Sequence, residues 1–327
     1  MKIHSKVFRK ILTIIQAIIS IGLLTHIFLR YNISLLNRAS ALSIPEWLIF
    51  SFFFTLVMIP ILSAVRWKIF LFYAGISEKL KQLIKMNFIS IFWGIMLPSS
   101  DGFAAIRMYL IEKKHRDQPG TSGSTIIAEK LLGFILLCFF GIFFSLFIHN
   151  IPQIALARII LILIAIIILS ITLIITNSSI YNYVSIRVKK IKFAGKVFKF
   201  LSSMHSSLTR LPFKKILLKA LPTMILIQLT TFINVYLIFK AMDINIPIIY
   251  HLTFVPVIQI ISLIPVTISG FGIREGAFVH FYGLIGIEPT VAFSVSILNF
   301  LILTGVPAFI GGIISIVSQI HKRDVVQ

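Results

Sequence analysis

Two charged side chains, Arg274 and Glu275, stand inside the stretch IPVTISGFGIREGAF (264–278), which is otherwise apolar and rich in glycine. A guanidinium can hold a phosphate through two parallel hydrogen bonds. A helix that starts after Gly270 would also direct free backbone N–H groups at the break, and such groups favour an anion. The stretch therefore predicts a site for a phosphate or a similar anionic headgroup.

A second stretch, LPSSDGFAAIR (97–107), shares these features. In both stretches an arginine follows a proline after nine residues, and a Gly-Phe pair lies between them. Proline lacks the N–H that a helix interior needs, and glycine tolerates left-handed backbone, so each stretch predicts a helix that breaks and restarts. The residues predicted to form the two breaks are Pro98, Gly102, Pro265, Gly270 and Gly272.

Charged residues in or beside apolar segments are costly unless they pair or face a polar cavity. The cost at the bilayer centre is about 2.5–3.5 kcal/mol each on an insertion scale. We therefore predict that the charged residues at such positions line a headgroup site. They are Arg66, Asp101, Arg107, Glu129, Arg274 and Glu275.

A simpler interpretation of these charged groups stays open. Arg274 and Glu275 can form an interfacial pair that ends a helix. Glu129 lies near the start of its apolar run, where charged side chains commonly snorkel to the surface. Arg66 stands beside Trp67, a combination typical of an interfacial anchor. We find no pattern of catalytic residues, metal ligands or cofactor-binding loops, so we predict no catalytic site, no metal and no cofactor.

The composition places these residues in a membrane protein. Of 327 residues, 58% are hydrophobic and 13% are charged, which is about half the charged share of a soluble domain. Apolar runs such as 11–29 and 159–176 meet the requirement of roughly 20 residues for crossing a bilayer. The net charge of +21 falls between such runs, which favours topology and anionic lipid over nucleic acid as its explanation.

Apolar segments can be marked at about 8–29, 47–65, 86–111, 126–149, 154–176, 217–239, 248–286 and 290–318. If all of them crossed the membrane, the ten basic residues within 177–219 would lie outside, against the positive-inside rule. If 86–111 and 248–286 instead return to the side they enter from, 24 of the 31 Lys and Arg lie inside. We therefore predict an all-α polytopic membrane protein with about six transmembrane helices, two re-entrant broken-helix hairpins and cytoplasmic termini.

The two hairpins would enter from opposite faces, and their likeness predicts an inverted-topology repeat within a single membrane domain, 1–327. The repeat halves would be about 1–150 and 151–318. Between the hairpins, the segment 177–219 interleaves lysine with apolar residues, which predicts an amphipathic cytoplasmic element lying on anionic lipid. Two broken helices that meet near the midplane would place a polar site at the repeat interface.

Four motifs resemble the transmembrane, flippase-like domain of bacterial lysylphosphatidylglycerol synthases and its stand-alone YbhN-type relatives. They are RWKIFL (66–71), LPSSDGFAAIR (97–107), EKLLG (129–133) and SGFGIREG (269–276), the last being the specific one. The resemblance covers nearly the whole chain. It implies movement of lipids or lipid-linked molecules between the leaflets of a bacterial inner (cytoplasmic) membrane. It also implies that a cavity is lined by Arg66, Arg107, Glu129, Gly272, Arg274 and Glu275.

The chain departs from the family pattern at two places. In the first broken segment Ala104 stands where relatives usually carry an acid, and Asp101 lies further back. In the last span Asn299 stands where relatives often carry an arginine. These differences argue against a lysyl-lipid substrate and for another anionic headgroup, such as that of a polyprenyl-phosphate-linked sugar. The chain ends at Gln327, nine residues after its last predicted span, so we expect no aminoacyl-transferase activity.

Three functions are weighed. The first is a flippase or transporter for an anionic phospholipid or lipid-linked precursor, with no enzymatic step. The second is a membrane-embedded transferase acting on a polyprenyl-phosphate-linked substrate, with Asp101, Glu112 and Asp117 as the nearby acids. The third is a non-transporting scaffold that recruits envelope-biosynthesis enzymes through its basic segment. Formation of a homo-oligomer is left open, and nucleic acid is not an expected partner.

Overall fold

The computed structural model describes residues 2–31, 43–97, 102–115, 121–189, 205, 208–209, 211–264 and 266–324. Three residues of the predicted breaks and site, Pro98, Asp101 and Pro265, lie outside these ranges. All regular elements of the described part are helical. They are α1 (Lys2–Tyr31), α2 (Pro45–Tyr73), α3 (Leu80–Ile95), α4 (Gly102–Lys114), α5 (Thr121–Ser145), α6 (Pro152–Thr176), α7 (Ser178–Lys189), α9 (Phe213–Ala241), α10 (Ile248–Ser262), α11 (Ile273–Gly283), α12 (Pro289–Phe300) and α13 (Val306–Asp324).

Within the described ranges, six helical stretches are long and apolar enough to cross a membrane. They are Ile14–Tyr31, Pro45–Tyr73, Gly123–Ser145, Pro152–Thr176, Phe213–Ala241 and Pro289–Ser318. These stretches coincide with the six uninterrupted apolar segments of the sequence, so the prediction of an all-α polytopic membrane protein is confirmed. The sixth stretch consists of α12 and α13, joined by a π-helical turn at Leu301–Gly305. Such turns frequently occur at functional sites.

The two interrupted apolar segments form pairs of shorter helices. The first hairpin consists of α3, with 16 residues, and α4, with 13, while the second consists of α10, with 15, and α11, with 11. At 1.5 Å per residue, none of these four helices reaches the roughly 30 Å of a bilayer core. The two helices of each hairpin pack against each other. That each hairpin returns to the membrane face it enters from stays a prediction.

The break in the second hairpin is made by left-handed backbone. Ser269, Gly270 and Gly272 have φ values of 51°, 77° and 86°, which an α-helix cannot accommodate. A side chain at Gly272 would also place its Cβ 2.7 Å from Cβ of Leu23 on α1. Position 272 therefore needs glycine both for its conformation and for the close approach of α1.

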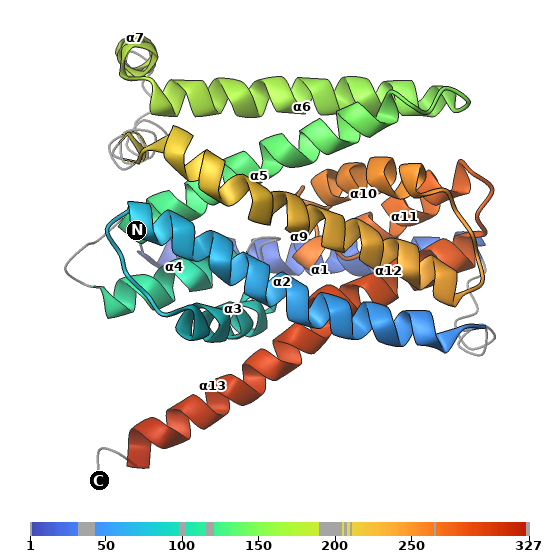
Figure 1. Cartoon of the computed structure of the whole chain (residues 1–327), viewed down its shortest axis with the longest axis horizontal. Helices are drawn as coiled ribbons and strands as arrows, with labels where there is room; N and C mark the ends of the chain where they lie inside the picture. Colours follow the sequence, from blue (N-terminus) through green and yellow to red (C-terminus); the bar gives the residue numbers. More distant parts are fainter. Residues whose placement is uncertain are drawn as a thin grey trace.

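A long helix of each half of the fold packs on the hairpin of the other half (Figure 1). α13 packs on α3 of the first hairpin, and α5 packs on α10 of the second, while the long helices α2 and α9 pack along each other. The order of long helix, broken hairpin and long helix in 45–145 recurs in 213–324. This order accords with an inverted repeat, but the repeat and its halves near 1–150 and 151–318 stay predictions.

A buried polar network joins α2, α9 and α12. Asn234 Oδ1 accepts hydrogen bonds from Ser51 Oγ at 2.7 Å and from Thr55 Oγ1 at 3.1 Å. Asn234 Nδ2 donates to Asn299 Oδ1 at 2.8 Å. Because buried polar groups are costly without partners, this network fixes how the three helices face one another.

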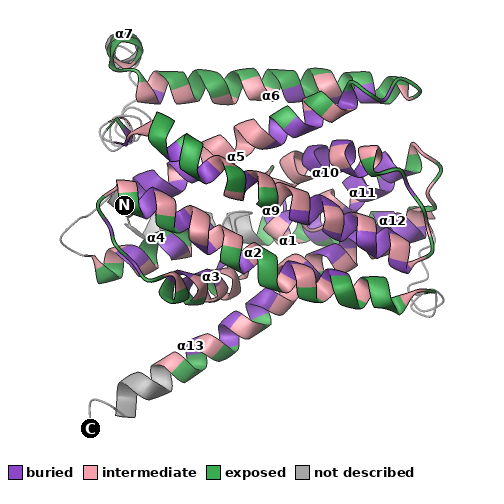
Figure 2. Ribbon diagram, in the orientation of Figure 1, coloured by how far each residue is buried: buried purple, intermediate pink, exposed green. Residues whose placement is uncertain are grey.

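α6 stands apart from the rest of the molecule and packs on α5 and α7 (Figure 1). Its residues are mostly exposed, whereas buried residues gather on α9 to α12 (Figure 2). The mean hydropathy of α6 is 3.3, so its exposed side chains present an apolar surface suited to lipid. α7 forms the beginning of the predicted amphipathic segment 177–219, and residues 190–204 of that segment lie outside the described ranges.

A charged cluster ties the loop between α2 and α3 to the end of α4. The buried carboxylate of Glu78 accepts a hydrogen bond from Lys114 Nζ at 2.7 Å and lies 2.7 Å from His115 Nε2. Burial alone would raise the pKa of Glu78, but the nearby Lys114 and His115 outweigh it and hold this pKa below its ordinary value. The cluster thus stabilises one end of the first hairpin.

This cluster predicts a pH dependence of stability. Because the pKa of Glu78 is lower in the folded protein, its carboxylate stabilises the fold fully above the ordinary value of 4.5. That stability is lost as the pH falls through the lowered folded pKa. Below pH 4.5, we expect the thermal midpoint in detergent to fall more steeply for the wild type than for Glu78→Gln. Equal slopes in the two proteins would contradict this role of Glu78.

Candidate functional site

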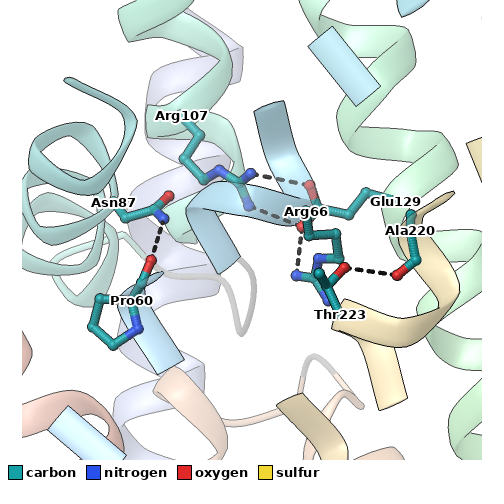
Figure 3. Close-up of polar contacts among 7 residues, drawn as sticks. All are labelled: Pro60, Arg66, Asn87, Arg107, Glu129, Ala220 and Thr223. Atoms are coloured by element: carbon teal, nitrogen blue, oxygen red, sulfur yellow. Dashed lines mark hydrogen bonds and ion pairs between the residues drawn. The ribbon is translucent and has the colours of Figure 1, made fainter. Parts of the chain in front are cut away.

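Three helices bring Arg66, Arg107 and Glu129 together in the interior (Figure 3). Arg66 lies on α2, Arg107 on α4 and Glu129 on α5. Arg107 Nη1 and Nη2 donate to Glu129 Oε1 and Oε2 at 3.0 Å each, as a fork. Arg66 Nη2 donates to Glu129 Oε1 at 2.5 Å. One carboxylate is therefore shared by two guanidinium groups, which leaves the cluster with a net positive charge.

The three members of this cluster differ in exposure. The side chains of Arg107 and Glu129 are 2% and 5% exposed, whereas that of Arg66 is 17% exposed. The guanidinium carbon of Arg107 also lies 4.0 Å from the centre of the fully buried Trp67 ring, a cation–π contact. Arg107 and Glu129 thus form a fixed internal pair, and Arg66 is the member that is more accessible to a ligand.

The second hairpin supplies another pair, Arg274 and Glu275. Arg274 donates to Glu275 Oε1 through Nε at 3.0 Å and also through Nη2. Glu275 is fully buried and accepts a hydrogen bond from the backbone N–H of Gly272 at 2.6 Å, at the start of α11. The guanidinium carbon of Arg274 lies beside two aromatic rings that contact each other, 4.5 Å from the centre of Phe300 and 5.2 Å from that of Phe271. Glu275 therefore fixes both the helix start and the direction of Arg274.

Two adjoining cavities separate the hairpins. The first has a volume of about 320 Å³, and its lining includes Thr55, Asn87 and Pro307. The second has a volume of about 370 Å³, and its lining includes Ile126 and Gln259. Six residues line both cavities, which shows that the two adjoin: Arg66, Phe103, Arg274, Phe300, Leu303 and Thr304. Arg66 of α2 and Arg274 of the second hairpin thus both line the junction of the cavities.

Positive charge dominates the lining of the second cavity. Its charged lining residues within the described ranges are Arg66, Arg107, Glu129, Lys130 and Arg274, so basic residues outnumber acidic ones four to one. In a low-dielectric interior such an excess attracts an anion strongly. The rest of the wall combines uncharged polar side chains, such as Gln228 and Gln259, with apolar ones, among them Phe134, Leu137, Val255, Ile258 and Phe278. The cavity can therefore accommodate an anionic group and an apolar chain together.

The structure brings most of the predicted site residues together. Arg66, Arg107 and Glu129 form one cluster, and Arg274 reaches the same cavities from the second hairpin. Glu275 does not line either cavity and instead supports Arg274. Gly102 lines the first cavity, while Gly272 does not line either one. Asp101 lies outside the described residues.

Two of the simpler interpretations do not fit this geometry. Trp67 is fully buried beneath Arg107, whereas an interfacial anchor would expose its ring at the membrane surface. Glu129 is bound by two arginines inside the protein and does not reach outward. The Arg66–Trp67 and Glu129 positions are therefore internal, and the charges there face one another or the cavities.

Sequence reasoning missed the polar residues of the first cavity. Asn87 lies in the apolar run 86–111, and a lone amide in such a run is a signal that could have been used. The hydroxyl side chains Ser63 and Thr304 also line this cavity. They carry no comparable signal, because Ser and Thr are common in membrane helices, where they bond to their own backbone.

The lysylphosphatidylglycerol synthase TM region family matches residues 13–311, which is most of the chain and includes every residue of the site. The chain belongs to this family. The chain is also similar to the UPF0104 membrane protein of Methanocaldococcus jannaschii, with 24% identity over 332 residues. The alignment covers 96% of this chain and 95% of the relative. No solved structure matches the chain. Family membership and the six apolar helices together identify a multi-pass membrane protein.

Proposed function

We propose that this protein moves an anionic phospholipid or a lipid-linked precursor between the two leaflets of its membrane. One observation carries the proposal: arginines from α2, α4 and the second hairpin line adjoining cavities in which basic side chains outnumber acidic ones. Membrane proteins rarely place ionisable groups in their interior without a functional reason. The family match supports the proposal, because the matched region is the transmembrane part of lysylphosphatidylglycerol synthases.

The transported headgroup would bind where the two cavities adjoin. Arg66 and Arg274 line both cavities and keep some exposure, 17% and 12% for their side chains. Their guanidinium groups would donate hydrogen bonds to the phosphate, which replaces its lost hydration. The acyl chains would stay against apolar walls and surrounding lipid, so only the polar headgroup needs a path across the bilayer.

No covalent step belongs to this proposal, and transport would run down the lipid gradient. The two buried carboxylates near the cavities are already engaged. Glu129 is bound by Arg66 and Arg107, and Glu275 by Arg274 and the N–H of Gly272. We place the protein in a bacterial inner membrane with both termini in the cytoplasm, in accordance with its charge distribution.

Leaflet exchange in proteoliposomes tests this proposal. We expect chain-labelled phosphatidylglycerol to exchange faster than chain-labelled phosphatidylcholine, because the cavities attract an anion. The measurement is the fraction of fluorescence that a membrane-impermeant reductant quenches, with protein-free vesicles as the control. Anionic exchange no faster than in protein-free vesicles, with folded protein present, would reject the transport function.

A further inference from the structure

The first cavity has fewer charged lining residues than the second. Its lining contains four hydroxyl side chains and one amide: Thr55, Ser63, Ser269, Thr304 and Asn87. Its only charged lining residues within the described ranges are Arg66 and Arg274, which it shares with the second cavity. The first cavity is therefore rich in uncharged hydrogen-bonding groups, with its positive charge at the junction.

Asn87 has an unused acceptor at this cavity. The residue is 5% exposed, and its Nδ2 lies 3.5 Å from the carbonyl oxygen of Pro60 (Figure 3). Its Oδ1 is buried and has no hydrogen-bond partner among the described residues. Buried polar atoms left without a partner are costly and therefore rare, and each needs an explanation. A ligand group that donates a hydrogen bond to Oδ1 would supply one.

The charges around the cavity decide which donor fits. An ammonium group would donate to Asn87, but the first cavity offers it no lining carboxylate and places it near two guanidinium groups. A hydroxyl group carries no charge, donates to an amide oxygen and accepts from serine or threonine. The lining of this cavity therefore matches a hydroxyl group better than an amine.

We propose that the first cavity binds an uncharged, hydroxyl-bearing part of the transported headgroup, while Arg66 and Arg274 hold the attached phosphate at the junction. This inference rests on the proposed function and narrows its substrate to anionic lipids that carry glycerol- or sugar-like hydroxyls beyond the phosphate. The volume of about 320 Å³ is sufficient for such a group, since small-molecule sites begin at roughly 300 Å³. Asn87 is then a specificity residue that distinguishes hydroxyl-bearing headgroups from bare phosphate.

Binding of short-chain lipids in detergent tests this assignment without requiring transport. The probes are dioctanoyl phosphatidylglycerol, phosphatidylinositol, phosphatidic acid and phosphatidylethanolamine, and the readout is the concentration dependence of the thermal midpoint. We expect the two hydroxyl-bearing anionic lipids to bind more tightly than phosphatidic acid, and phosphatidylethanolamine to bind most weakly. The order of phosphatidylglycerol and phosphatidylinositol then tells whether a glycerol or a ring fits better.

Asn87→Leu removes the amide and keeps the approximate shape of the side chain. We expect it to weaken binding of the hydroxyl-bearing lipids by roughly 3- to 10-fold, the equivalent of one hydrogen bond. Binding of phosphatidic acid should change less. Without bound lipid, Asn87→Leu should be at least as stable as the wild type, because the buried Oδ1 that lacks a hydrogen-bond partner is gone. Gln82→Leu makes the matched change on α3 outside both cavities and should preserve the wild-type order of affinities.

Each outcome bears on the assignment. Equal binding of phosphatidic acid and phosphatidylglycerol by the wild type would overturn it, as would equal losses for both lipids in Asn87→Leu or no binding at all. Selective binding without leaflet exchange would retain the hydroxyl site and reject transport. Leaflet exchange that ignores the headgroup hydroxyls would retain transport and reject the hydroxyl site.

Discussion

Replacing Arg107 with alanine will destabilise the protein by about 3–5 kcal/mol, the usual cost of removing one partner of a buried ion pair. The variant leaves Glu129, 5% exposed, with the single hydrogen bond from Arg66. It also empties the space over the buried Trp67 ring. The measurement is the thermal or denaturant midpoint in detergent, read against that of the wild type.

Two further variants separate charge pairing from simple loss of volume. Arg66→Met and Arg107→Met combined with Glu129→Leu removes all three charges of the cluster and retains most of the volume, so it should recover much of the lost stability. Arg66→Ala should cost less, because Arg66 is partly exposed and its removal leaves the Arg107–Glu129 fork in place. If Arg107→Ala proves no more destabilising than Arg66→Ala, the fixed internal pair is not the structural centre of the cluster.

Arg274→Ala will reduce exchange of anionic lipid by roughly 10- to 100-fold, since a hydrogen bond to a charged group contributes about 1.5–3 kcal/mol. Arg274 lines both cavities, so its loss removes donors from the position proposed for the phosphate. Glu275 keeps the backbone N–H of Gly272 and lies 3.4 Å from Ser296 Oγ, at the favourable start of α11. The variant also leaves the fully buried Glu275 without its cation, so it should lose some stability, which the thermal midpoint reports separately from the loss of transport.

The control for this variant is Arg274→Lys, which retains the positive charge but cannot donate two parallel hydrogen bonds to one phosphate. It should exchange lipid at a rate between those of the wild type and Arg274→Ala, because lysine binds phosphate as a point charge. Both variants are compared at equal amounts of folded protein, judged by thermal midpoint. Wild-type exchange by Arg274→Ala would show that this side chain is not part of the headgroup site.

The helices could be predicted from the sequence because each depends on local properties. Long apolar runs and the distribution of basic residues indicated the six spans, and glycine with proline indicated where 248–286 breaks. The backbone at Gly270 and Gly272 shows the local reason, since both have positive φ. Helix ends were less accurate: α3 begins at Leu80, six residues before the predicted segment, because Lys81 and Lys85 interrupt its apolar pattern.

The site could be predicted only in part. Charged residues in apolar segments stand out in the sequence, but their pairing does not, because Arg66 and Glu129 are 63 residues apart. Burial of Trp67 beneath Arg107 depends on how α2 and α4 meet, and no local pattern encodes it. The same holds for Asn87, whose importance comes from an acceptor left unused in a cavity. Such features arise from tertiary packing, which a sequence pattern does not specify.

In the proposed function, the two adjoining cavities are the path of the headgroup. Thr304 lines both of them, and the native Cys138 is buried, so Thr304→Cys in a Cys138→Ser background provides a single reactive thiol in the path. The measurement is the exchange of anionic lipid, read by extraction of labelled lipid into albumin without reductant, before and after that thiol is modified with a charged methanethiosulfonate. We expect exchange to stop when the thiol is modified and to return when a reductant removes the label. Undiminished exchange through fully modified protein would contradict it.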